Sequence, residues 1–217
     1  MQDADPIESV HPAIEPAARG AWLERHGHWL APLTLVALVC LYYFDYLLGR
    51  VFIWEDLLRQ YYPTANYFCT SIRAGHFPFW QPGLMNGVPF YTDLQVGLYY
   101  PFTWLLVLFV RDGTLPVLVF QWYIVLHFCL GGLGLYAFLK HHRLSPVACL
   151  VGSIIFCFAG FSALHVIHLP MVEAYAWLPI QFLLVDKIVT TRRAKYYAWL
   201  TLAILLSLLA GFPQTVL

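Results

Sequence analysis

Two acidic residues and an arginine, Glu55, Asp56 and Arg59, stand close together in a long stretch between apolar runs, residues 49–114. On a helix Asp56 and Arg59 would share a face, because they are three residues apart, while Glu55 would point about 100° away. A carboxylate can take the proton of an acceptor hydroxyl, and an arginine can hold the phosphate of a lipid-linked donor. The plainer interpretation is a solvated ion pair that contributes less than about 1 kcal/mol to stability. The other polar groups of this stretch are Gln60, Arg73, His76, Asn86, Asp93 and Gln95.

Further candidates lie beyond this stretch. His165 and His168 could bind a metal ion or a donor phosphate, but two histidines alone make an incomplete metal site, and packing against aromatic rings is the simpler interpretation. Glu173 stands near the start of an apolar run, where a carboxylate is costly, and is therefore a functional candidate. For Gln121 and His127, inside another apolar run, hydrogen bonding between helices is the favoured interpretation.

The composition narrows the class of protein. Of the 217 residues, 60% are hydrophobic and 11% are charged, against about 45–50% and about 25% in ordinary soluble domains. These proportions exclude a disordered chain, a nucleic-acid binder and an ordinary soluble enzyme. They predict an all-α polytopic membrane protein with no nucleic-acid partner and with the lipid bilayer as its surroundings.

Five apolar runs are long enough, or nearly so, to cross about 30 Å of hydrocarbon. Ser145 before Pro146 is a predicted N-cap, and the glycines at 131, 132 and 134 predict close helix contacts. Residues 1–28 are polar and rich in proline, and they predict a disordered cytoplasmic tail before a membrane domain over residues 29–217. The predicted spans are residues 29–48, 115–139, 146–163, 170–189 and 196–210.

Basic residues set the predicted orientation. They gather before the first span, at residues 140–143 and at residues 187–195. With a cytoplasmic N-terminus, all three clusters fall inside the cell, as the positive-inside rule expects. Residues 49–114 then form a large external loop. The chain stops just as an apolar run begins, and we expect it to be the N-terminal part of a longer polytopic protein.

Local signals divide the external loop. Residues 51–62 predict an amphipathic helix, and Pro63 predicts the start of a second helix that ends at Gly75. Residues 76–90 predict an irregular but packed segment, and Thr92 or Asp93 predicts a cap. Residues 98–110 are too few to span the bilayer. They predict a short helix, opened by Pro101, in the outer interface, with Tyr99, Tyr100 and Trp104 at headgroup depth.

An ordered set of short motifs resembles the N-terminal part of the YfhO-type bacterial membrane proteins, from Trp29 to the end. The stretch EDLLRQYYP begins at Glu55, PFWQP at Pro78, NGVP at Asn86, and DLQ at Asp93. The later motifs are YYP at residues 99–101, FAGF at 158–161, His165 and His168, AWLP at 176–179 and GFPQ at 211–214.

That family is similar to the GT-C class of polytopic glycosyltransferases, and the resemblance implies a fold and an activity. It implies an enzyme of the bacterial inner membrane that moves a sugar from a polyprenyl-phosphate donor to a cell-envelope acceptor on the outer face, with inverting displacement. Asp56 is then the acid or base. Glu55 stands where we would expect a small residue, so either carboxylate remains a candidate. Many GT-C enzymes carry an acidic residue in the second external loop, where this chain has His165 and His168.

The sequence thus predicts a glycosyltransferase with no metal ligand set, although a divalent metal stays open. A transporter or flippase-like protein and a non-catalytic membrane partner are the alternatives. The predicted catalytic residues are Asp56 and Glu55. The predicted substrate-binding residues are Arg59, Arg73, Asp93, Gln95, His165 and His168.

Overall fold

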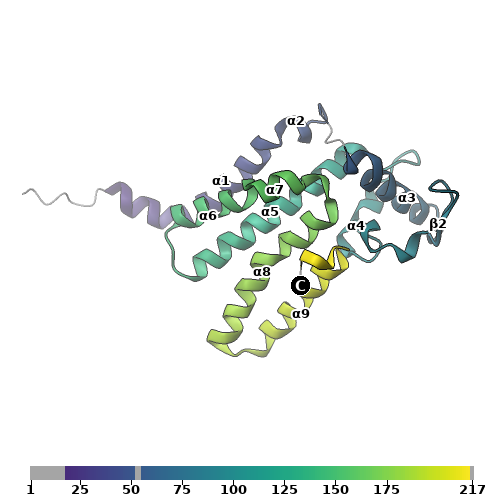
Figure 1. Cartoon of the computed structure of the whole chain (residues 1–217). Helices are drawn as coiled ribbons and strands as arrows, with labels where there is room; N and C mark the ends of the chain where they lie inside the picture. The colour runs from purple at the N-terminus through teal and green to yellow at the C-terminus, as the bar shows by residue number, and fades with distance from the viewer. Residues whose placement is uncertain (1–17, 52–54, 216–217) are drawn as a thin grey trace, which may run out of the picture.

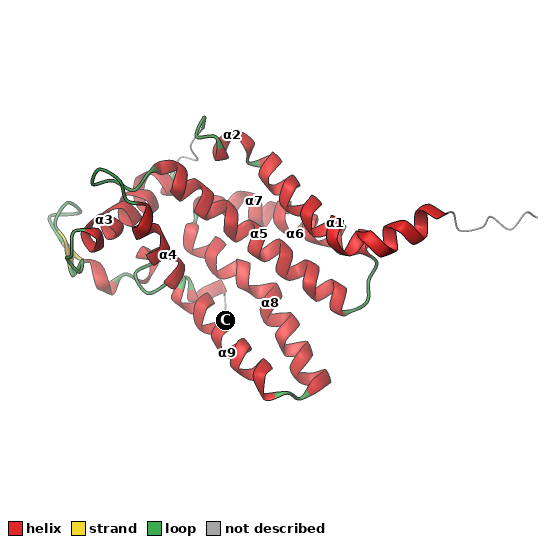
Figure 2. Ribbon diagram, turned by 180° about the vertical axis from the view of Figure 1, so that it is seen from behind, coloured by secondary structure: helices red, strands yellow, loops and turns green. Residues whose placement is uncertain are grey.

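The structure is a computed structural model that describes residues 18–51 and 55–215. Within these ranges the chain is mostly helical, which confirms the predicted helical class (Figures 1 and 2). Five helices run back and forth between two ends of a bundle (Figure 1). They are α1 (Ala18–Tyr42), α5 (Val117–His141), α6 (Pro146–Phe158), α8 (Leu169–Thr191) and α9 (Ala194–Leu209).

Helix α5 is the centre of this bundle. It packs against α1, α6 and α8, and α9 packs on α8. The connections α5–α6 and α8–α9 lie together at one end, and most of the shorter elements gather at the other end (Figure 1). These shorter elements are α2 (Phe44–Leu47), α3 (Tyr62–Arg73), α4 (Pro101–Leu106) and the antiparallel strands β1 (Trp80–Gln81) and β2 (Val88–Pro89).

Among the residues that the structure describes, two segments are long and apolar enough to cross a membrane, Val117–His141 and Pro146–Ile167. Two further apolar helices are shorter, His26–Tyr42 and Ala194–Leu209. The structure therefore supports a helical protein with two candidate spans, and the number of five stays a prediction.

Two predicted segments differ in part from the helices of the structure. Helix α1 begins at Ala18, inside the predicted disordered tail of residues 1–28, while residues 1–17 lie outside the described residues. The predicted span of residues 146–163 is interrupted, because Ala159 takes an extended conformation with ψ of 155°. Helix α6 ends there, and α7 (Gly160–Leu164) and a 3₁₀ turn (His165–Ile167) complete the passage to α8.

The first part of the external loop also differs from its prediction. Val51 is not helical, and residues 52–54 lie outside the described residues. The helix begins at Asp56 with a π-helical turn, Leu57–Tyr61, and continues into α3 without a break at Pro63. A wide turn of this kind often occurs at functional sites. The end of α3 was predicted correctly, since Gly75 follows it with φ of 81°.

Residues 98–110 form a short helix rather than a span. Helix α4 is opened by Pro101, as predicted, and has six residues, too few to cross a bilayer. Tyr99 and Trp104 are exposed, whereas Tyr100 is fully buried among other side chains. The headgroup depth of these residues stays a prediction.

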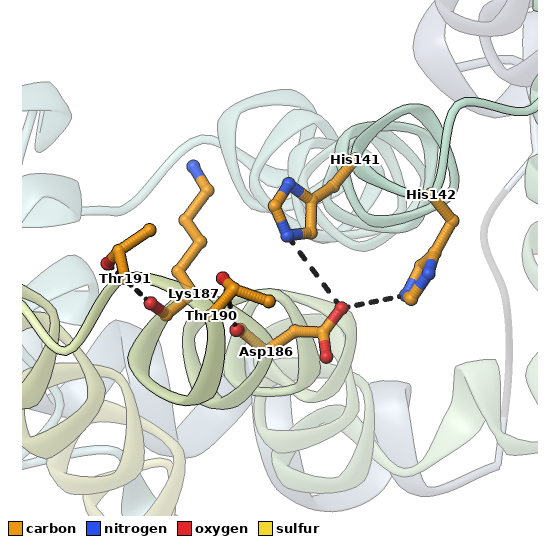
Figure 3. A network of polar contacts seen from close by, with 6 residues as sticks. All are labelled: His141, His142, Asp186, Lys187, Thr190 and Thr191. Atoms are coloured by element: carbon orange, nitrogen blue, oxygen red, sulfur yellow. Dashed lines mark hydrogen bonds and ion pairs between the residues drawn. The ribbon is translucent and has the colours of Figure 1, made fainter.

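At the opposite end of the bundle, one carboxylate joins α5 to α8. Asp186 lies between His141 and His142 (Figure 3), with Nε2–Oδ2 distances of 3.8 and 2.9 Å. The hydroxyls of Thr190 and Thr191 turn back to carbonyls of their own helix. Asp186 thus links the ends of two helices.

The glycines of α5 confirm the predicted close contacts between helices. A Cβ atom at Gly131 would lie 2.9 Å from a ring carbon of Phe156 and 3.2 Å from the Cα atom of Ala176. Side chains of α6 and α8 therefore occupy the space that any larger residue would need.

Gly131→Ala is expected to lower stability by about 1–3 kcal/mol, because the helices must separate to admit the methyl group. The measurement is the apparent melting temperature of the purified protein. Gly160→Ala is the matched control: nothing lies within 4 Å of its added Cβ atom, so the melting temperature should hardly change. Equal effects at both positions would contradict the packing.

The predicted orientation can be tested at two exposed positions. In cells, Arg193→Cys should resist a membrane-impermeant thiol reagent, because the α8–α9 connection carries the basic residues expected inside. His76→Cys should react. The native protein is a suitable background, since Cys69, outside the predicted spans, is fully buried and burial raises the pKa of its thiol to about 12. Labelling at 193 without labelling at 76 would reverse the topology.

Candidate functional site

The π-helical turn, the start of α3 and the hairpin enclose a cavity of about 520 Å³. Asp56, Arg59 and Asp93, three of the residues predicted from the sequence, line it. Its other walls are Gln60, Pro63, Thr64, Gln81, Leu84, Met85, Val88, Pro89, Phe90, Thr92 and Val96. The volume lies in the range of ligand pockets, about 300–1,000 Å³.

Asp56 has a partner from a distant part of the chain. Its Oδ2 atom lies 3.5 Å from Nε2 of His168, which directly precedes α8. The side chain of Asp56 is 43% exposed, so water and small solutes reach it. The other nitrogen of His168, Nδ1, is buried without a hydrogen-bond partner among the described residues. Asp56 is thus the polar group that faces this imidazole.

Helical spacing predicts that Arg59 and Asp56 share a face. In the structure the ion pair of Arg59 is with Glu55. Nη1 of Arg59 lies 3.8 Å from Oε2 of Glu55, and both side chains are substantially exposed. Glu55 and Arg59 are four residues apart, a spacing that also makes two side chains neighbours on a helix. Asp56 lines the cavity and pairs with His168, whereas Glu55 pairs with Arg59.

The remaining predicted residues take other positions. Nδ1 of His165 lies 2.8 Å from the Phe161 carbonyl oxygen and its ring stacks on Phe161 at 4.2 Å, which confirms the simpler interpretation of packing against an aromatic ring. Arg73 is exposed in the last turn of α3 and does not line the cavity. In the described part of the chain, no group of three or more metal-ligating side chains is brought together.

Asp93 lines the cavity, and Gln95, two residues further on, lines a smaller neighbouring cavity instead. Asp93 accepts a hydrogen bond from the backbone N–H of Gln95 at 2.9 Å, which confirms it as a cap. Tyr61 donates its hydroxyl to Oε1 of Gln95 at 3.4 Å. Burial, followed by the nearby charges of Asp56, Asp93 and Glu173, raises the pKa of Tyr61 to about 12, so it stays a hydrogen-bond donor.

A buried polar network lies directly behind Tyr61. Glu173 of α8, 2% exposed, accepts the hydroxyl of Tyr123 of α5, and Thr103 of α4 lies 3.4 Å from the same hydroxyl. A small cavity of about 10 Å³ separates Tyr61 from Glu173, which is about the space of one water molecule.

Two further hydrogen bonds fix the position of the Tyr100 hydroxyl. Nε1 of Trp177 donates to this hydroxyl at 2.9 Å, and Nε2 of His127 lies 3.0 Å from the same oxygen. The sequence offered Glu173 and His127 as polar residues in apolar runs. It gave no signal for Tyr100 and Tyr123, because tyrosines near a membrane surface are common.

The model of a protein family described as bacterial membrane protein YfhO matches residues 29–207. The chain belongs to the YfhO family. The match runs from α1 through α9, so it covers the bundle and both sides of the cavity of this YfhO protein. Neither a search of curated proteins nor a search of solved structures found a match.

The buried network of this YfhO protein predicts a difference between two Tyr→Phe substitutions. Tyr123→Phe leaves Glu173 buried without its donor and should cost about 1–3 kcal/mol of stability. Tyr99→Phe removes an exposed hydrogen bond to the Tyr91 carbonyl and should cost less than about 1 kcal/mol. The shift in apparent melting temperature measures both. A smaller loss at Tyr123 than at Tyr99 would contradict the importance of the Glu173 contact.

Proposed function

We propose that this YfhO family member transfers a sugar from a polyprenyl-phosphate donor to an acceptor on the outer face of the bacterial inner membrane. The observation that carries the proposal is Asp56, an accessible carboxylate in a cavity of about 520 Å³, paired with His168. A general base needs access to its substrate and a fixed orientation. Asp56 has both. The resemblance to GT-C enzymes, with an acidic residue in the first external loop, supports the same assignment.

Each group in the cavity has a part in the proposed reaction. Asp56 takes the proton of the acceptor hydroxyl as the oxygen attacks the anomeric carbon of the donor. The bond from that carbon to the lipid phosphate breaks, and the phosphate leaves with the electron pair. The guanidinium of Arg59 stabilises the charge that develops on the phosphate. His168 is a positioning residue that orients the carboxylate.

The two neighbouring carboxylates differ in their fitness for the role of base. Asp56 lines the cavity and Glu55 does not. Glu55 instead lies next to Arg59, so its charge holds the phosphate-binding side chain. This division favours Asp56 as the base and gives Glu55 an indirect effect on donor binding.

Asp56→Asn should lower turnover by a factor of about 10²–10⁴, the usual contribution of a general base. The substitution keeps the size of the side chain and most hydrogen bonds, so folding should survive. Glu55→Gln, the matched control, should act mainly by raising the KM for the donor. The measurement is sugar transfer from a polyprenyl-phosphate donor in membranes, with the amount of protein determined in parallel.

Two other outcomes are informative. Full activity of Asp56→Asn together with an inactive Glu55→Gln would assign the base to Glu55. Full activity of both variants would remove the carboxylates from the reaction, and a transporter or a non-catalytic membrane partner would become the better description.

A further inference from the structure

The hairpin that closes the Asp56 cavity exposes a group of large apolar side chains. Met85 is 85% exposed, Phe79 is 63% exposed and Trp80 is 54% exposed. We define the aromatic hairpin as residues 76–92. It contains no lysine, arginine, aspartate or glutamate. Its other exposed large apolar residues are Phe77, Leu84 and Tyr91. Contiguous apolar surface of this kind marks contact with a membrane or a partner.

The aromatic hairpin is a fixed part of the structure. Strands β1 and β2 pair Trp80 with Pro89, and the hydroxyl of Tyr67 in α3 donates to the Trp80 carbonyl at 2.6 Å. Phe90 is buried against the ring of Tyr67. The exposed side chains therefore project from a backbone that α3 holds in place, so their exposure is a permanent feature of the surface.

We infer that the aromatic hairpin dips its side chains into the headgroup layer of the outer leaflet. The chain belongs to a family of membrane proteins, and the aromatic hairpin exposes large apolar side chains without a lysine, arginine, aspartate or glutamate among them. The hydroxyl of Tyr99 donates to the Tyr91 carbonyl at 2.7 Å, which joins the aromatic hairpin to the segment that leads to the exposed Trp104. Tryptophan and tyrosine are enriched at this depth of a bilayer.

The shape and the chemistry of the surface favour lipid over a sugar polymer. A sugar ring packs on a flat aromatic face, but the ring of Phe79 is tilted by 53° to Phe77 and by 75° to Tyr91. Leu84 and Met85, at the tip, are aliphatic. A mixture of flexible aliphatic chains and tilted rings suits a fluid layer better than a rigid polymer.

Backbone hydrogen bonding limits the depth of insertion. Irregular backbone does not occur exposed to lipid in the hydrocarbon region, because its N–H and C=O groups have no water there. The aromatic hairpin has only two short paired strands, and its remaining residues are turns and irregular backbone. The side chains therefore enter the interface while the backbone stays at the level of the headgroups.

This depth has a consequence for the cavity. Leu84 and Met85 lie at the tip of the aromatic hairpin, and both also line the cavity. Contact of the tip with lipid places the cavity mouth beside the headgroup layer, where the phosphate of a lipid-borne substrate lies. Such a substrate would enter sideways from the membrane. The membrane contact itself does not depend on the proposed reaction.

The test measures the depth of single fluorophores in vesicles. The full chain carrying Met85→Cys or Phe79→Cys is labelled with a polarity-sensitive fluorophore and reconstituted into vesicles of phosphatidylethanolamine and phosphatidylglycerol. Arg111→Cys, in the exposed turn before α5, is the matched control. A nitroxide on the lipid headgroup should quench the fluorophores at 85 and 79 at least about twice as strongly as it quenches the one at 111. Aqueous iodide should show the reverse order.

The inference is overturned if the headgroup nitroxide quenches the fluorophores at 85 and 79 no more strongly than the one at 111 and iodide reaches all three equally. The aromatic hairpin would then be exposed to water or covered by a protein. Strong quenching by a nitroxide near the acyl-chain end would also contradict the headgroup depth. None of these quenching measurements requires turnover, so their results do not depend on the activity of the Asp56→Asn protein.

Discussion

The hydrogen bond between Tyr123 and Glu173 is the contact on which the arrangement of the site depends. Glu173 is the one carboxylate among the described residues that is fully buried, and a buried carboxylate without a partner is strongly unfavourable. The hydrogen bond that Glu173 accepts from Tyr123 links α8 to α5, and the contact of Thr103 with the same hydroxyl links α4 to both. Three separate elements are thereby held in one relative position.

The same link positions the residues of the cavity. His168 directly precedes α8, about one helical turn from Glu173, so fixing Glu173 also fixes the imidazole that faces Asp56. Tyr61 lies on the other side of the small cavity and belongs to the π-helical turn that begins next to Asp56. The buried network therefore determines, from within the bundle, how an exposed carboxylate and its histidine meet at the surface.

Local chemistry made much of the fold predictable. Pro101 opens α4, Ser145 caps α6 by accepting the backbone N–H of Ala148, and Gly75 ends α3, all as the sequence predicts. Each of these signals acts within a few residues. The Asp56–His168 pair could not be predicted this way, because more than a hundred residues separate its partners. The Glu55–Arg59 pair, by contrast, has the i, i+4 spacing of helix neighbours and lay within reach of the same local reasoning.

The structure also separates two roles that the sequence presents as similar. Glu173 stands out in the sequence, since a carboxylate in an apolar run is costly and suggests function. In the fold this residue has a fixed donor and is 2% exposed, which suits a structural contact. Asp56 looks ordinary in the sequence, yet it is 43% exposed, faces a histidine and lines a cavity of ligand size. A base that is used in every turnover must exchange its proton with solvent, so accessibility rather than rarity distinguishes the carboxylate fit for chemistry. Burial assigns the other carboxylate to holding the helices in place around it.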